Sequence, residues 1–115
     1  MKEECALVTG GAGFIGSNLA KALVKRKMNV VVYDNFSTGR AENLPRDSKK
    51  LTIIQGDILD RERLTQVMDG IDIVFHNAAR VTIRNSLDHF LEDAEINLMG
   101  TVNVLEAIRK ISSVK

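Results

Sequence analysis

The sequence predicts an α/β fold with a doubly wound parallel sheet, and three features support this. Short apolar runs typical of buried strands alternate with amphipathic helical segments along the 115 residues. A glycine-rich turn joins the first strand to the first helix. The alternation implies right-handed crossovers, which place helices on both faces of one parallel sheet.

The first half of the chain supplies two strands and one helix. The first strand, Cys5–Thr9, is a short apolar run that stops at glycines. In the helix that follows, Ile15, Leu19 and Leu23 recur every four residues, so we expect this stripe to pack on the sheet. The second strand, Asn29–Asp34, has a β-branched core. The segment after it, up to the chain's only proline, is expected to be a non-helical loop.

Two further strands and two helices are expected in the second half. The third strand is Leu51–Gln55, the short helix Arg61–Met68 ends before Gly70, and the fourth strand covers residues 72–76. The spacing over residues 88–110 predicts one long helix. Its buried face is expected to contain Ile96, Met99, Val104, Leu105 and Ile108. The expected strand order is 3-2-1-4, the first part of a Rossmann-type sheet.

Composition limits the class of protein and its partners. Hydrophobic residues make up 44% and charged residues 27%, which is typical of a single globular domain, here residues 1–115. The net charge of +1 gives no reason to expect nucleic acid or an anionic membrane as a partner. No apolar run reaches the roughly 18 residues of a membrane span. The N-terminus does not resemble a signal peptide, and Cys5 is the single cysteine, so a cytoplasmic location is expected.

The glycine-rich turn has the pattern of a phosphate-binding loop. Gly10, Gly13 and Gly16 are spaced three apart between the first strand and the first helix, and Gly11 completes the tighter Gly-x-Gly-x-x-Gly form. Glycine allows the sharp turn, close approach of a pyrophosphate and close helix–strand packing. The helix N-terminus would direct its unpaired amides at the phosphates. A nucleoside triphosphatase is disfavoured, because the turn lacks the Gly-Lys-Ser/Thr ending.

An acidic residue completes the dinucleotide-binding pattern. The pattern expects one about 20 positions after the turn, at the end of the second strand, where it accepts hydrogen bonds from the adenosine ribose. Asp34 is at that place. Its carboxylate would repel a 2′-phosphate, which favours NAD over NADP, although Arg40 nearby could pair with such a phosphate. The alternative is that Asp34 is only a turn residue at a strand end.

Five blocks of the sequence resemble a known family in the same order. They are TGGAGFIGSNL, DNFSTG, GDILD, VFHNAA and INLMGTVNVLEAIRK. They resemble the N-terminal part of the extended short-chain dehydrogenase/reductase family, and within it the NAD-dependent nucleotide-sugar epimerases and dehydratases of the UDP-glucose 4-epimerase type. The departure is Asn77, where this branch more often has an apolar residue.

The resemblance implies a cofactor role for each matching position. The pyrophosphate would meet the glycine turn, the adenosine ribose would meet DNFSTG, the adenine would meet GDILD, and the nicotinamide-side ribose would meet the end of the fourth strand. The implied NAD-binding residues are Gly10, Gly13, Phe14, Ile15, Gly16, Asp34, Asn35, Ser37, Gly39, Asp57, Ile58, Ala78, Ala79 and Asn97. An alternative for Asp57 is a cap on the helix that begins near Asp60. His76 is expected to be a packed histidine at a strand end and not a catalytic one.

Catalysis in this family belongs to a Tyr-x-x-x-Lys pair, and the resemblance places that pair beyond the fifth strand. The single tyrosine, Tyr33, is expected to be buried in the second strand. The chain is therefore expected to bind NAD without turning over a nucleotide sugar, as part of a longer enzyme whose substrate domain lies outside it. The resemblance also implies homodimerisation through helices that include the last one. The alternatives are a stand-alone NAD-sensing or partner-docking module, and a part of another extended-family reductase.

Overall fold

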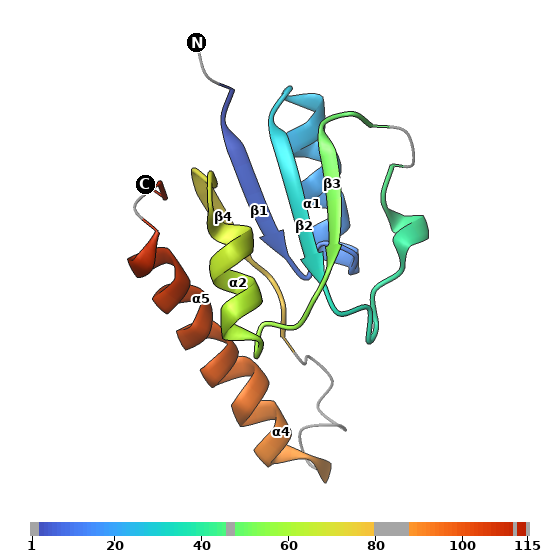
Figure 1. Ribbon diagram of the computed structural model, residues 1–115. Helices are drawn as coiled ribbons and strands as arrows, with labels where there is room; N and C mark the ends of the chain where they lie inside the picture. Colours follow the sequence, from blue (N-terminus) through green and yellow to red (C-terminus); the bar gives the residue numbers. More distant parts are fainter. Residues whose placement is uncertain (1–2, 46–47, 80–87, 112, 115) are drawn as a thin grey trace.

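The computed structural model describes residues 3–45, 48–79, 88–111 and 113–114. Four parallel strands form one sheet in the order β3-β2-β1-β4, which confirms the expected fold class and strand order (Figure 1). The elements are β1 (Cys5–Thr9), α1 (Phe14–Lys25), β2 (Asn29–Asp34), η1 (Ala41–Asn43), β3 (Leu51–Gln55), α2 (Arg61–Met68), β4 (Ile73–His76), α4 (Phe90–Ala94), η2 (Glu95–Met99) and α5 (Gly100–Lys110).

The register of the sheet brings the carboxyl ends of the strands together. Thr9, the last residue of β1, lies opposite Tyr33 on one side and His76 on the other. Asp34, the last residue of β2, lies opposite Gln55 of β3. In a doubly wound sheet, ligands bind outside this edge, where the strand order reverses. Here the reversal falls between β1 and β4, next to the glycine turn that follows β1.

Two hydrophobic cores cover the two faces of the sheet. Side chains alternate across each strand, so Val8 and Val32 face α1 whereas Leu7 and Tyr33 face α2 and α5. Figure 1 shows α1 on one face of the sheet and α2 and α5 on the opposite face. All four of these side chains have no exposed surface. Burial on both faces explains why β1 and β2 are nearly continuous apolar runs.

The predicted apolar stripe of α1 is wrong at one position. Leu23 is buried and Leu19 is partly buried against the core, but the side chain of Ile15 is 69% exposed. The buried face of α1 is formed instead by small residues, Gly16 and Ala20, together with Leu23. Gly16 allows the helix to pack closely on the glycine turn, and Ile15 lines the cleft instead of the helix–sheet interface.

The long C-terminal helix is present, with a change of geometry that the spacing did not indicate. α4 and α5 are joined by η2, a π-helical turn, where the helix widens. Val104 is buried as expected, and Ile96 and Ile108 pack on the core, but Met99 is 37% and Leu105 is 59% exposed. These two expectations are wrong, because the apolar stripe is wider than the surface that α2 and the sheet cover. In the part of the chain that the structure describes, no helix is long and apolar enough to cross a membrane.

Candidate functional site

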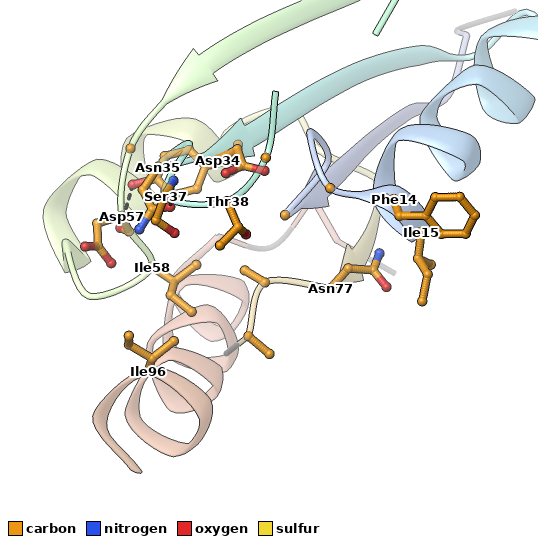
Figure 2. Close-up of a pocket in the computed structure, with 18 residues that line it drawn as sticks. Phe14, Ile15, Asp34, Asn35, Ser37, Thr38, Asp57, Ile58, Asn77 and Ile96 are labelled. Atoms are coloured by element: carbon orange, nitrogen blue, oxygen red, sulfur yellow. Dashed lines mark hydrogen bonds between the residues drawn. The ribbon is translucent and has the colours of Figure 1, made fainter. Parts of the chain in front are cut away.

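A cleft of about 320 Å³ opens at the carboxyl ends of β1, β2 and β4, beside the N-terminus of α1 (Figure 2). Every residue that the sequence implied for NAD binding lines this cleft, except Asn97. The cleft is also lined by residues that the sequence did not indicate. These are Tyr33, Thr38, Gly56, Asn77 and Ile96, and each is next in sequence to a residue that was predicted.

The three glycines of the turn have three different structural requirements. Gly10 has a φ of 66°, and a Cβ there would lie 2.8 Å from the backbone nitrogen of Ala78. A Cβ at Gly16 would overlap the carbonyl oxygen of Gly10 and lie 2.8 Å from Cα of Gly11. A Cβ at Gly13 would meet only the carbonyl oxygen of Gly10, at 3.4 Å. Gly10 therefore makes the turn, Gly16 allows close packing, and Gly13 keeps the cleft side of the turn free of a side chain.

The N-terminus of α1 is suited to hold an anion. Its N-cap is Gly13, which has no side chain to accept from the first-turn amides, and the first turn contains no acidic residue. Phe14 and Ile15, the first two helical residues, line the cleft and are 83% and 69% exposed. Backbone N–H groups and the positive end of the helix dipole are thus available to a phosphate at this point.

Asp34 is joined directly to the glycine turn. The residue is 8% exposed. Oδ2 of its carboxylate accepts from the backbone N–H of Ala12 at 2.9 Å, and Oδ1 accepts from the N–H of Phe36 at 2.8 Å. The second bond is that of a turn residue, so the alternative reading of Asp34 describes part of its role. Each carboxylate oxygen has a second lone-pair site, which leaves capacity for ribose hydroxyls.

The loop after β2 folds back onto the same turn. The carbonyl oxygen of Ala12 accepts from the backbone N–H of Arg40 at 3.0 Å and from Nδ2 of Asn43 at 2.8 Å. The expectation of an entirely non-helical loop is wrong, because residues Ala41–Asn43 form the 3-10 turn η1, which directs Asn43 at the glycine turn. Arg40 is exposed and is not among the residues that line the cleft.

The loop that carries Asp57 and Ile58 is held from two sides. The hydroxyl of Tyr33 donates to the carbonyl oxygen of Asp57 at 2.7 Å, and Nδ2 of the buried Asn103 donates to the carbonyl oxygen of Ile58 at 3.0 Å. The alternative of Asp57 as a helix cap is wrong, since the N-cap of α2 is Asp60. The cleft wall next to β2 is therefore fixed by buried hydrogen bonds.

Tyr33 gives a testable consequence of this burial. Desolvation raises the pKa of Tyr33 to about 12, with a further contribution from the charge of Asp60. An unfolded tyrosine titrates near pH 10, so the folded chain should lose stability as pH rises from about 10 towards 12. The chain has one tyrosine and no tryptophan, so ultraviolet titration reports this group alone. Tyrosinate formation near pH 10 in the folded chain would contradict the assignment, and Tyr33→Phe is the blank.

The end of β4 is tied to β1 and to α5 through His76. Its Nδ1 lies 2.7 Å from Oγ1 of Thr9, and its Nε2 lies 3.0 Å from Oγ1 of Thr101. Partial burial lowers the pKa of His76 below its usual value, so the ring is neutral near pH 7. His76 is a packed strand-end histidine, as expected, and both of its ring nitrogens have hydrogen-bond partners. It does not line the cleft, unlike Asn77 and Ala78 beside it.

Asn97 is the one implied binding residue that the structure places elsewhere. It lies on the π-helical turn η2, is exposed, and is not among the residues that line the cleft. Its neighbour Ile96 takes that place. Gly100, one turn later, allows α5 to pack closely, because a Cβ there would lie 2.8 Å from Cγ1 of Ile58.

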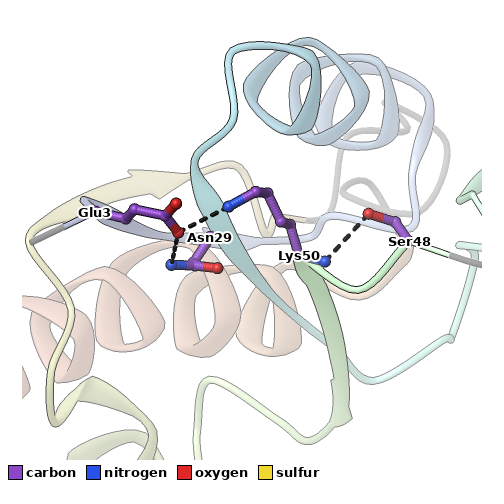
Figure 3. A network of polar contacts seen from close by, with 4 residues as sticks. All are labelled: Glu3, Asn29, Ser48 and Lys50. Atoms are coloured by element: carbon purple, nitrogen blue, oxygen red, sulfur yellow. Dashed lines mark hydrogen bonds and ion pairs between the residues drawn. The ribbon is translucent and has the colours of Figure 1, made fainter.

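A separate polar cluster lies at the opposite, amino end of the strands (Figure 3). Oε2 of Glu3 accepts from Nζ of Lys50 at 2.7 Å and from Nδ2 of Asn29 at 3.2 Å, and the hydrogen bond from Lys50 lowers the pKa of Glu3. The side chains are partly or largely exposed, so this ion pair contributes little to stability. It joins the beginnings of three strands and has no part in the cleft.

Comparison with known proteins decides the family. The family model for NAD dependent epimerases/dehydratases matches residues 6–115. The chain belongs to the NAD dependent epimerase/dehydratase family. The expected resemblance is confirmed, and so is NAD as the cofactor, since the family is NAD dependent. The glycine turn and Asp34 that predicted the cofactor both lie within the matched region.

Similar proteins include epimerases from several organisms. A putative UDP-glucose 4-epimerase of Methanocaldococcus jannaschii is 37% identical over 105 residues, which is 90% of this chain and 33% of the relative. The structure of an epimerase from Methanothermobacter thermautotrophicus has a TM-score of 0.92 and 39% identity, and the match covers 98% of this chain and 33% of that one. A Thermus thermophilus UDP-glucose 4-epimerase in complex with NAD has a TM-score of 0.83 and 37% identity, covering 92% and 34%. The chain thus spans about a third of the length of these relatives.

Proposed function

We propose that this chain binds NAD across the cleft and is the dinucleotide-binding part of an enzyme that epimerises or dehydrates a nucleotide sugar. The observation that carries the proposal is the 2.9 Å hydrogen bond from the N–H of Ala12 to Oδ2 of Asp34. It keeps a helix N-terminus suited to phosphate next to a carboxylate suited to ribose. Residues 1–115 would form one Rossmann half-domain for this purpose.

In this proposal each wall of the cleft receives one part of the dinucleotide. The pyrophosphate would lie on the turn and the first helical amides, and the adenosine ribose on Asp34 and the loop after it. The adenine would lie against the Asp57 loop, and the nicotinamide-side ribose against Ala78 and Ala79. The small side chains of these two alanines leave room for close approach. The turn residues are Gly10, Gly13, Phe14, Ile15 and Gly16, and the ribose loop residues are Asn35, Ser37 and Gly39.

The test of the proposal is a calorimetric titration of the chain with NAD and with NADP. The negative charge of Asp34 should repel the 2′-phosphate of NADP, so we expect NAD to bind at least about tenfold more tightly, a preference that corresponds to about 1.4 kcal/mol. ADP should bind more weakly than NAD, because it reaches only part of the cleft. Equal or tighter binding of NADP would overturn the preference, and absence of binding at millimolar NAD would overturn the proposal.

Bound NAD supplies a hydride acceptor, and the residues described above would hold and orient it. Oxidation of a sugar hydroxyl also needs a base that removes the hydroxyl proton. The chain's only tyrosine is not suited to this role. Tyr33 has no exposed surface and its hydroxyl is committed to Asp57. We therefore propose that this chain alone does not turn over a nucleotide sugar. Sustained formation of an epimer from UDP-glucose and NAD would contradict this.

Assembly and location complete the proposal. Large apolar side chains on α4, η2 and α5 are exposed, among them Phe90, Leu91, Leu98 and Leu105. An exposed apolar face of this kind favours association, so we propose a homodimer through these helices, which sedimentation at several concentrations would test. A cytoplasmic location is proposed because the single cysteine cannot form an internal disulfide.

A further inference from the structure

A chain of hydrogen bonds runs from the end of β4 to the C-terminal helix, beneath one wall of the cleft. The backbone N–H groups of Asn77 and Ala78 donate to Oγ1 of Thr9 at 3.0 and 3.2 Å. Thr9 contacts His76, which contacts Thr101. Thr101 in turn lies 2.7 Å from a carbonyl oxygen of the π-helical turn, that of Asn97. Residues that are 67 and 25 positions apart in sequence thus share one network.

The direction of each bond follows from the number of hydrogens available. A carbonyl oxygen can only accept, so the hydroxyl hydrogen of Thr101 points at Asn97. Oγ1 of Thr101 must then accept from Nε2 of His76, which carries the ring hydrogen. In a neutral imidazole this leaves Nδ1 bare, and Nδ1 accepts the hydroxyl hydrogen of Thr9.

The Thr9 end of the network indicates the same tautomer of His76. Oγ1 of Thr9 already accepts from the backbone N–H groups of Asn77 and Ala78. The N–H of Asn77 also donates to the carbonyl oxygen of Thr9, at 3.1 Å. With both lone-pair sites engaged, the hydroxyl of Thr9 can contribute only its hydrogen to His76. Both ends therefore require the Nε2–H form of the ring.

We propose that His76, fixed as its Nε2–H tautomer between Thr9 and Thr101, is a positioning residue that holds the Asn77 and Ala78 wall of the cleft against the C-terminal helix. This inference rests on the proposed NAD binding for its effect on affinity. The wall has little freedom to move, because Ala78 also lies directly against Gly10 of the glycine turn. Loss of the network should therefore affect the nicotinamide side of the cleft and leave the side next to Asp34 intact.

The tautomer is tested first, in the unaltered chain without nucleotide. Long-range proton–nitrogen correlation spectra of the ¹⁵N-labelled chain report which ring nitrogen is protonated. The chain has only two histidines, and the exposed His89 provides an internal comparison. At pH 7.5 we expect a bare Nδ1 and a protonated Nε2 for His76. An Nδ1–H tautomer or a charged ring would overturn the inference whatever the outcome for NAD.

The positioning role is tested with Thr101→Val, which removes the acceptor for Nε2–H at nearly constant shape. The matched control is Thr65→Val, because Thr65 makes the same type of bond to a carbonyl oxygen four residues earlier, at 2.9 Å, on a helix where it has no contact with His76. We expect Thr101→Val to weaken NAD binding about fivefold to tenfold, because Nε2–H of the half-buried His76 is left without its acceptor. The affinity for ADP should change less than about twofold.

The remaining variants separate positioning from general damage. Thr101→Ser restores the hydroxyl and should recover NAD affinity, whereas Thr65→Val should leave both affinities unchanged. Equal losses of NAD and ADP affinity in Thr101→Val, or no loss of either, would overturn the positioning role. If the unaltered chain binds no NAD, the proposed function fails, and the histidine spectrum still decides the tautomer by itself.

Discussion

Gly16→Ala is expected to destabilise the chain by about 3 kcal/mol, at the upper end of the cost of overpacking, and to abolish NAD binding. The new methyl group would overlap the carbonyl oxygen of Gly10 and lie 2.8 Å from Cα of Gly11. Both are backbone atoms of the tight turn, so no side chain can rotate away. Relief requires α1 to move off the turn, which would displace the amides that face the cleft. Urea unfolding followed by circular dichroism measures the first effect, and calorimetry measures the second.

Two other glycines of the chain supply controls for this experiment. Gly13→Ala should fold nearly normally, because its methyl group meets only the carbonyl oxygen of Gly10, at 3.4 Å, but it should weaken NAD binding by occupying the cleft side of the turn. Gly70 has a φ of 81° and open space around it, so Gly70→Ala should cost only backbone strain, about 1 kcal/mol, and leave NAD affinity unchanged. Stability of Gly16→Ala equal to that of Gly70→Ala would contradict the close-packing argument.

The two central strands could be predicted from the sequence because they are largely buried on both faces of the sheet. A buried parallel strand leaves a short apolar run whichever way its side chains point, so the strands Cys5–Thr9 and Asn29–Asp34 are visible without knowledge of their neighbours. The edge strand Leu51–Gln55 is partly exposed and is visible only as a short, largely apolar run. The glycine turn is equally visible, because its glycines follow a fixed spacing between a strand and a helix. These two features alone correctly place the cleft at the carboxyl ends of the strands.

The orientation of the helices could not be read in the same way. Periodicity identifies an apolar stripe but not which part of a wide stripe is covered, and so Met99 and Leu105 were expected to be buried. Ile15 lies in the first turn of the helix and lines the cleft, while the buried face is formed by Gly16, Ala20 and Leu23. The π-helical turn η2 changes the phase of the helix, so Ile96 lines the cleft where Asn97 was expected.

The hydrogen-bond partners of His76 also could not be predicted from the residues near it in the sequence. Thr9 and Thr101 are far from it in sequence, and no motif around residues 75–77 indicates a hydrogen-bonded ring. The additional cleft residues have a simpler explanation. Thr38 and Gly56 lie beside predicted positions in loops that curve around the cleft. The resemblance implied only single positions of these loops, whereas the folded loops line the cleft with consecutive residues.

Asp34→Ala is expected to lower NAD affinity by about tenfold to a hundredfold, because hydrogen bonds to a charged group are worth about 1.5–3 kcal/mol. The substitution also removes the acceptor for the N–H groups of Ala12 and Phe36, so stability without nucleotide should fall by about 2 kcal/mol. Unfolding measured with and without NAD separates the two losses. A ligand that binds only the folded chain raises its melting temperature, and this rise should shrink in the variant.

Asp34→Asn removes the charge and keeps one of the two hydrogen bonds that the carboxylate accepts from the backbone. The amide keeps one oxygen acceptor but no negative charge, so NAD affinity should fall less than in Asp34→Ala while discrimination against NADP disappears. The control is Asp69→Asn, the same change of net charge at an exposed residue that does not line the cleft. It should alter neither affinity, because a charge in solvent is screened within about 10 Å. If Asp34→Asn still prefers NAD as strongly as the unaltered chain, the carboxylate is a turn residue only, and the source of the preference must be sought elsewhere in the cleft.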